Sequence, residues 1–416
     1  MSSPPTEPSP TNAGEQRATG RKAMSRLGSL DLIRGAVMVV MAIDHVRVYS
    51  GLPAGGPTPG IFFTRWITHF CAPVFVFLAG TSAWLYGRKH ADLTRFLVVR
   101  GAGLILLELT VLRLAWTFNL DFAHYELAGV IWVIGLCMIG LAVLARLPAP
   151  VVGGIGVAII AGHNLLDAPM AARLASLDDG GGATLWRILY LGPAGGPIRI
   201  GSTGPDLHVL YSFVPWIGVI AAGFGFGAVM ALAPRRRNRI CLAVGLAAMA
   251  LFLVLRGFGL YGDPRPWRAM IDGHDGRPGM PVALAFLNTT KYPASLQFLL
   301  MTLGPVIASI AVLDRARGAA VRWLTLLGRV PLFFYVLHIP LIHVLAIATS
   351  WIRQGELSTW LFANHPMGSP PAPDGYTWSL PLLYLVWLIA IVLLSLACAW
   401  FAGLKVRRPD GWLRFL

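Results

Sequence analysis

Long apolar stretches recur along this chain of 416 residues, and they limit its fold more than any other feature. Apolar residues make up 56% of the sequence and charged residues only 13%, a balance typical of polytopic membrane proteins. A helix needs about 20 mostly apolar residues to cross a hydrocarbon core of about 30 Å. The sequence therefore predicts an all-α fold, a transmembrane bundle of about ten spans at 31–50, 67–86, 96–118, 127–147, 149–168, 208–233, 239–258, 294–313, 323–350 and 379–403.

The basic residues alternate from loop to loop, and this alternation predicts the orientation of the chain. If the N-terminus is cytoplasmic, the short loops on that side carry most of the arginines, while the longer loops 169–207, 259–293 and 351–378 lie on the opposite side with few charges. By the positive-inside rule we expect both termini in the cytoplasm. The same pattern explains the net charge of +15 without a nucleic-acid partner. Richness in Ala, Gly and Arg indicates a bacterial inner membrane as the location.

The chain divides into one membrane domain and two short tails. Residues 1–29 are basic and rich in Pro, Ser, Thr and Gly, which predicts a disordered cytoplasmic tail. No signal-peptide pattern precedes the first span, so we expect the membrane domain to run from 30 to 404, followed by a basic tail at 405–416. Four single cysteines in apolar stretches are expected to be small core residues and not disulfides: Cys71, Cys137, Cys241 and Cys398.

Arg34 and His45 lie on one face of the first apolar stretch. Eleven residues at about 100° each return to within about 20° of the starting direction, with an axial rise of roughly 16 Å. An arginine near the centre of a membrane helix costs about 2.5 to 3.5 kcal/mol on insertion scales, so ionisable groups there usually serve a pathway or a site. Arg34 is therefore a candidate binding residue, with snorkelling to the cytoplasmic headgroups as the alternative.

Two histidines flank the first outer loop, and they are candidates for acid–base chemistry. The loop 51–60 is short, so the helices it joins are antiparallel neighbours and His45 is expected to approach His69. Asp44 could fix the tautomer of His45, but adjacent residues point about 100° apart on a helix, so we expect another helix to orient His45. The alternative is a polar and aromatic belt at the membrane surface, made of His45, Arg47, Tyr49, Arg65 and Trp66.

Three more polar segments carry candidate substrate-binding residues. Asp206 and His208 precede the sixth span, where Pro205-Asp206 predicts a helix start capped by the acid, and the later glycines predict close helix packing. Asn288, Lys291 and Tyr292 precede the eighth span and suit a sugar or an anion, or simply the interface.

His338 stands inside an apolar helix between two prolines. Pro331 and Pro340 free backbone carbonyls that need hydrogen-bond partners. His338 therefore suits either a structural bond to such a carbonyl or a role in substrate binding.

Several of these segments together resemble bacterial heparan-α-glucosaminide N-acetyltransferase-like integral membrane proteins, which are related to the transmembrane acyltransferase superfamily. The resemblance runs from about residue 25 to 345 and includes L30-D-L-I-R-G35, P73-V-F-V-F-L-A-G80, Y261-G-D-P-R-P-W267, L287-N-T-T-K-Y-P293 and G328-R-V-P-L-F-F-Y-V-L-H338. The spacing of Arg34 and His45 also resembles the Arg/His motif of membrane O-acyltransferases that modify envelope glycans.

The resemblance implies transfer of an acyl group, in the family an acetyl group, from cytoplasmic acyl-CoA to an amine or hydroxyl of an extracytoplasmic glycan or glycolipid. Arg34 would meet a CoA phosphate, and an outer histidine would act as base or carry the acyl group. Acetyl-CoA is then the donor substrate, and neither metal nor haem is expected. The family's loop histidine has no counterpart in 51–60, so the candidate catalytic residues are His45 first, His69 second, and Asp44 beside them.

Two other functions fit parts of the sequence. A secondary transporter of a small anionic or sugar-like substrate would use Arg34 and His338, although the chain has no evident internal symmetry. A haem-binding electron carrier would need two facing histidine pairs among His45, His69, His338 and His343, and such pairs are not evident. The expected partners are the bilayer and a glycan or glycolipid acceptor, with a homodimer left open beside a monomer.

Overall fold

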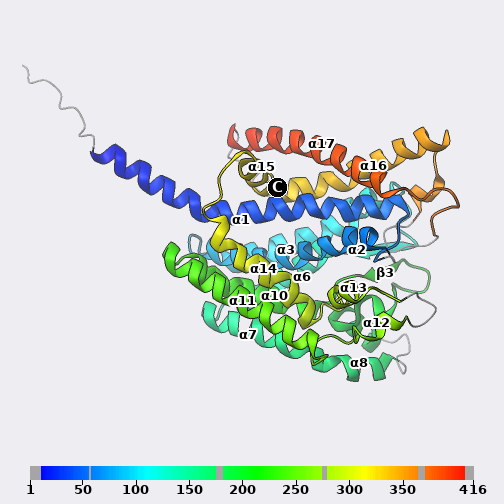
Figure 1. Cartoon of the computed structure of the whole chain (residues 1–416), viewed down its shortest axis with the longest axis horizontal. Coiled ribbons are helices and arrows are strands. Elements are labelled where there is room, and N and C mark those ends of the chain that lie inside the picture. Colours follow the sequence, from blue (N-terminus) through cyan, green and yellow to red (C-terminus); the bar gives the residue numbers. More distant parts are fainter. Residues whose placement is uncertain (1–10, 56–57, 175–180, 274–278, 364–370, 408–416) are drawn as a thin grey trace, which may run out of the picture.

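The chain forms a bundle of long helices, shown in Figure 1 aligned along one common direction. The computed structural model describes residues 11–55, 58–174, 181–273, 279–363 and 371–407. Within these residues, 7 helical segments are long and apolar enough to cross a membrane: Pro59–Gly87, Ala149–Arg173, Phe213–Met230, Pro234–Gly257, Leu296–Leu313, Pro331–Gln354 and Leu380–Arg407. The all-α membrane fold is thus confirmed, and the count of ten spans stays a prediction.

The described helices have the following bounds. The long ones are α1 (Thr11–Ser50), α3 (Cys71–Gly87), α4 (Leu93–Leu107), α6 (Val130–Leu144), α7 (Ala149–Gly162), α10 (Phe213–Met230), α11 (Pro234–Gly257), α14 (Leu296–Leu313), α16 (Pro331–Gln354) and α17 (Leu380–Arg407). The short ones are α2 (Pro59–Trp66), α5 (Arg113–Thr117), α8 (Asp167–Leu174), α9 (Gly181–Trp186), α12 (Ala269–Asp272), α13 (Val282–Leu287) and α15 (Ala319–Gly328). A π-helical turn, η2 (Glu108–Leu112), joins α4 to α5. Single turns complete the helices: η1 (Ile67–Phe70), η3 (His163–Leu166), η4 (Arg187–Leu191), η5 (Gly192–Gly195) and η6 (Thr359–Phe362).

The predicted tails overlap the ends of described helices. Helix α1 begins at Thr11, inside the predicted tail 1–29, and α17 ends at Arg407, inside the predicted tail 405–416. Residues 1–10 and 408–416 lie outside the described residues. The domain boundaries therefore stay predictions.

One end of the bundle, here called the loop end, carries a small sheet. Strands β1 (Tyr125–Ala128), β2 (Ile198–Arg199) and β3 (Asp206–Val209) are ordered β1-β3-β2, with β1 parallel and β2 antiparallel to β3. Figure 1 places β3 at the same end as α12 and α13. The opposite end, where the bundle begins on α1, is called the terminal end.

Two sequence-based boundaries were wrong. Asp206 does not cap a helix, because residues 206–209 pair with β1 and α10 begins only at Phe213. The partner strand lies about eighty residues earlier, so local propensity gave no sign of it. The predicted span 323–350 is two helices, α15 and α16, since Pro331 at the start of α16 has no N–H to continue the preceding helix.

Glycines let two pairs of helices touch backbone to backbone. A Cβ on Gly35 would lie 1.9 Å from the carbonyl oxygen of Leu324, which brings α1 onto α15. A Cβ on Gly223 would lie 2.0 Å from the Phe77 carbonyl oxygen, which brings α10 onto α3. The prediction that the glycines of α10 serve close packing is confirmed.

Candidate functional site

Two adjacent cavities lie at the loop end. The histidine cavity, about 330 Å³, contains His45, Asp44, Glu108 and Tyr335, and the cationic cavity, about 460 Å³, contains His69, Asn288 and Arg265. Both are lined by Ala54, Arg65, Lys291 and Tyr292, so these residues form a shared wall.

His45, which is half-buried, and His338, which is fully buried, form a pair inside the bundle. His45 Nδ1 lies 2.5 Å from His338 Nε2, and the rings stack with centroids 4.7 Å apart. Trp116 packs edge-on against the His45 ring at 4.9 Å. Helix α16 therefore supplies the second helix that was expected to orient His45. His338 bonds to a backbone carbonyl, that of Tyr335, and its expected role in substrate binding stays a prediction.

The carbonyl of Tyr335 fixes the tautomers of this pair. His338 Nδ1 lies 2.5 Å from that carbonyl oxygen, which can only accept, so Nδ1 carries the proton. Neutral His338 then accepts at Nε2, and His45 donates from Nδ1. The lone pair of His45 is left on Nε2, for which the described residues show no hydrogen-bond partner. His45 is thus arranged as a base that lines the histidine cavity.

Asp44 binds cations and not His45. Its carboxylate accepts from Arg47 Nε at 2.8 Å and lies 3.6 Å from Arg65 Nη1. The expectation that Asp44 fixes the tautomer of its neighbour is replaced by the bond from His338. Asp44 instead pairs with Arg47 and Arg65 near the C-terminal end of α1.

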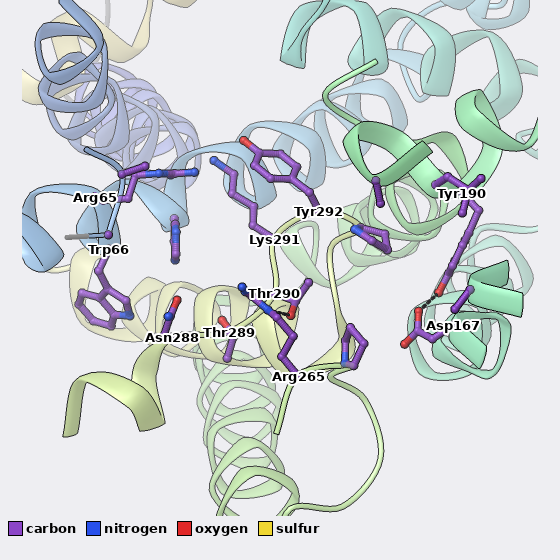
Figure 2. A pocket seen from close by; sticks show the side chains of 18 of the residues that line it. Arg65, Trp66, Asp167, Tyr190, Arg265, Asn288, Thr289, Thr290, Lys291 and Tyr292 are labelled. Carbon is purple, nitrogen blue, oxygen red and sulfur yellow. Dashed lines mark hydrogen bonds between the residues drawn. The ribbon is translucent and has the colours of Figure 1, made fainter. Parts of the chain in front are cut away.

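Lys291 projects a buried ammonium into the shared wall. Its side chain is 8% exposed, and Nζ lies 5.7 Å from the ring centroid of Tyr211 and 5.2 Å from that of Tyr292. Burial lowers the pKa of Lys291, which lies in the loop between α13 and α14, and nearby Arg65 lowers it further. Figure 2 shows the Arg65 guanidinium and the Lys291 ammonium pointing toward each other, with Asp167 on the far side of the cavity.

His69 lies in the cationic cavity, apart from His45. It is 7% exposed, packs edge-on against Phe298 at 5.5 Å, and its Nδ1 is buried without a hydrogen-bond partner among the described residues. The expected approach of His45 to His69 is not among the contacts of the described residues, because His45 turns toward α16 instead.

The remaining predicted residues separate into two groups. Asn288 lines the cationic cavity and donates to the sulfur atoms of Met270 and Met280. Asp206 and His208 lie on β3, where Asp206 pairs with Arg199 at 3.0 Å and His208 packs on Tyr125, and neither lines the two cavities.

Arg34 is anchored inside the bundle near the terminal end. Its guanidinium pairs with Asp31 at 2.9 Å and donates to Ser82, and its side chain is 20% exposed. It is not among the residues that line the large groove at this end. Arg34 therefore has protein partners already, and its expected role in donor binding stays a prediction.

The groove at the terminal end, here called the terminal groove, is lined by arginines, aromatic rings and one carboxylate, Asp92. It measures about 1050 Å³ and contains Arg95 and Arg100 beside stacked rings. Tyr86 stacks on Phe96 at 4.0 Å and on His90 at 4.1 Å. Such a groove suits a flat ring and anionic groups together.

Sequence reasoning missed Glu108, a buried carboxylate in the π-helical turn. Its Oε2 accepts from the backbone N–H groups of Ile131 at 2.8 Å and Trp132 at 3.0 Å, at the start of α6. It also lines the histidine cavity. A single glutamate within the apolar stretch 96–118 was the signal, since an acid inside a membrane span usually marks a site.

The histidine pair also bears on the haem alternative. Two nitrogens that ligate one metal at about 2.0 Å each stand about 4 Å apart across it. The 2.5 Å between His45 and His338 leaves no room for an ion. Among the described residues, no group of three or more His, Cys, Asp or Glu side chains forms a candidate metal site.

Comparison with known families agrees with the resemblance seen in the sequence. Residues 26–260 match the family described as heparan-alpha-glucosaminide N-acetyltransferase, catalytic, a stretch that includes Arg34, His45 and His69. A comparison with curated proteins found no match. Because the matched stretch covers more than half of the chain, the protein belongs to the heparan-alpha-glucosaminide N-acetyltransferase catalytic-domain family, an integral membrane acetyltransferase family.

Proposed function

We propose that the protein transfers an acetyl group from acyl-CoA, bound at the terminal groove, to an amine or hydroxyl of a glycan or glycolipid in the histidine cavity. With the expected orientation, the donor enters from the cytoplasm and the acceptor from the other side of a bacterial inner membrane. Family membership supports the acetyl donor. That the donor is acyl-CoA, and that the acceptor is a glycan or glycolipid, are both part of the proposal.

The observation that carries this proposal is how closely the two sites approach. Leu104 lines the terminal groove and Glu108, four residues later, lines the histidine cavity. On α16, Leu332 likewise lines the terminal groove, and Tyr335, three residues later, lines the histidine cavity. Residues three or four apart share a helix face about one turn, or roughly 5 Å, apart. A thioester on a long flexible arm can bridge such a gap.

The terminal groove supports binding of a nucleotide-bearing donor. Phe96, Tyr86 and His90 form one stack, whose exposed end at His90 offers a ring face for an adenine, and Arg95 and Arg100 offer guanidinium groups for phosphates. The pantetheine arm would then run along Leu104 and Leu332 toward the histidines. Arg34, one layer deeper on α1, remains a proposed second contact.

His45 is the proposed base. The acceptor nitrogen or oxygen attacks the thioester carbonyl carbon, a C–N or C–O bond forms, and the C–S bond breaks. His45 takes the proton of the attacking group on Nε2 and passes it to the departing CoA thiolate, so that the products are the acetylated acceptor and free CoA. General bases of this kind contribute about 10²- to 10⁴-fold to the rate.

The test is acetyl transfer by the purified protein in lipid nanodiscs, with radiolabelled acetyl-CoA and glucosamine as probes. His45→Ala is expected to lower the transfer rate at least about 100-fold. His124→Ala, on an exposed side chain at the same end, is the matched control and should retain the rate. Normal turnover in His45→Ala would overturn the proposal, and uptake of glucosamine into liposomes without acetyl-CoA would favour a transporter.

A further inference from the structure

The residues that line the two cavities carry more positive charge than their carboxylates balance. Arg47, Arg65 and Lys291 converge on one carboxylate, Asp44, which lies closest to Arg47. The second carboxylate of the histidine cavity, Glu108, already accepts from two backbone N–H groups. The third, Asp167, lies on the far side of the cationic cavity, where it accepts a hydrogen bond from Tyr190.

Lys291 is the least balanced of these cations. It is 8% exposed, and among the described residues no carboxylate oxygen lies within 4.0 Å of its ammonium. The phenol rings of Tyr211 and Tyr292 lie beside it, the Tyr292 hydroxyl hydrogen-bonds to it, and Asp44 acts on it only from a greater distance. A buried charge without a counter-charge is costly, and removing it from water is compensated only by pairing or by strong hydrogen bonds.

Arg65 leaves part of its guanidinium unused. Its Nη1 is buried and has no hydrogen-bond partner among the described residues, although Asp44 lies 3.6 Å away. Arg65 belongs to the shared wall of both cavities, and its guanidinium lies beside Lys291. A ligand oxygen there would gain two charge-assisted bonds at once.

The cationic cavity also contains a third cation, Arg265. Arg265 donates through Nε to Thr290 at 2.9 Å, so the side chain is fixed at the cavity. Thr289 and Thr290 line the same side, which provides hydroxyl groups suited to a sugar. Figure 2 shows Arg265 and Thr290 on the Lys291 side, away from Asp167.

We propose that the acceptor carries an anionic group, a phosphate or a carboxylate, which binds between Arg65 and Lys291 while its amine or hydroxyl reaches His45. This inference rests on the proposed function, because it defines the acceptor of that reaction. A neutral sugar would satisfy hydrogen bonds but leave the buried ammonium unbalanced. Because both cavities share the cationic wall, the anion and the reacting group must lie on the same sugar or on adjacent ones.

The experiment compares three acceptors: glucosamine, glucosamine 6-phosphate and 2-amino-2-deoxyglucuronic acid. Each is assayed for binding, by thermal stabilisation of the full-length protein in nanodiscs, and for acetyl transfer. The wild-type protein should bind at least one anionic sugar about tenfold or more tightly than glucosamine. The better anionic ligand identifies phosphate or carboxylate as the recognised group.

Variants then assign the effect to the wall. Lys291→Gln and Arg65→Gln should reduce the preference for the anionic sugar over glucosamine to about twofold or less. Arg268→Gln changes an exposed arginine of the same loop that lines neither cavity and should keep the preference.

The outcomes separate the two proposals. If Lys291→Gln lowers kcat equally for all three acceptors, the cations act on the reacting carbonyl oxygen and the anionic acceptor is wrong. If the wild-type protein shows no preference among the sugars, the inference is likewise overturned. If anionic sugars bind through Lys291 but no acetyl is transferred, the anion site stands and the proposed transferase function fails.

Discussion

The terminal groove and the histidine cavity hold charge in opposite ways. In the groove, Arg95 is exposed and aromatic rings stack side by side over a volume of about 1050 Å³. In the cavity, about 330 Å³ in volume, the reactive histidine is fixed by a chain of hydrogen bonds: the Tyr335 carbonyl holds His338, and His338 holds His45. An open surface suits a large ligand that exchanges, whereas a small, fixed cavity suits a reaction.

The difference shows where mutations should act. Changes in the groove should alter how tightly the donor binds, and changes around His45 should alter the rate of the chemical step. Lys291 differs from both cases: it lines the histidine cavity, but because it is proposed to bind the acceptor, its mutation should alter acceptor binding.

The largest of the remaining effects is expected at His338, which touches His45 and no proposed substrate atom. His338→Ala removes the acceptor that keeps the proton on His45 Nδ1, so kcat should fall about 10- to 100-fold with little change in KM. His338→Gln keeps an acceptor oxygen and should restore part of the rate. Equal loss in both variants would mean that the residue serves packing alone. The pH–rate profile should shift only in a variant that loses the hydrogen bond to His45 Nδ1.

A smaller effect is expected in the terminal groove. The double variant Arg95→Gln/Arg100→Gln should raise the KM for acetyl-CoA about tenfold and leave kcat within about twofold. Acetyl-pantetheine lacks the nucleotide and its phosphates, so its KM should not change. Arg34→Ala should weaken acetyl-CoA binding less, because Arg34 is already paired with Asp31. Arg235→Gln, exposed at the start of α11, is the control, and equal effects on both donors would place the nucleotide elsewhere.

The smallest effect is a pH dependence of acceptor binding. Burial lowers the pKa of Lys291, so its ammonium loses the proton at a lower pH than a free lysine would. The groups that face it are Asp44, Arg65, Tyr211 and Tyr292. Affinity for an anionic sugar should therefore be full at low pH and decrease as the pH rises through that lowered pKa. Lys291→Arg keeps its charge and should remove the decrease, and an unchanged profile would assign it to another group.

The sequence predicted the apolar helices well, but it did not predict which distant residues contact one another. Apolar length located the spans because a membrane helix satisfies its own backbone hydrogen bonds. The strand at Asp206 was missed because its partner lies in a distant loop, and the pairing of His45 with His338 spans 293 residues. The cost of burying an ionisable group singled out Arg34, His45 and His338, each of which has a polar partner in the structure, and the same reasoning applied to Glu108 would have singled it out too.

The close approach of Leu104 and Glu108 on one helix face has an electrical consequence. If water fills both sites, most of the membrane voltage falls across about one helical turn. The acyl group leaves the electron pair of its C–S bond on sulfur and therefore crosses as the equivalent of a cation, while the acceptor's proton, passed through His45 to the thiolate, crosses in the opposite direction. The two charge movements cancel. Moving one uncompensated charge through 100 mV would be worth about 2.3 kcal/mol, so a turnover rate that does not respond to membrane voltage is the expected sign of this exchange.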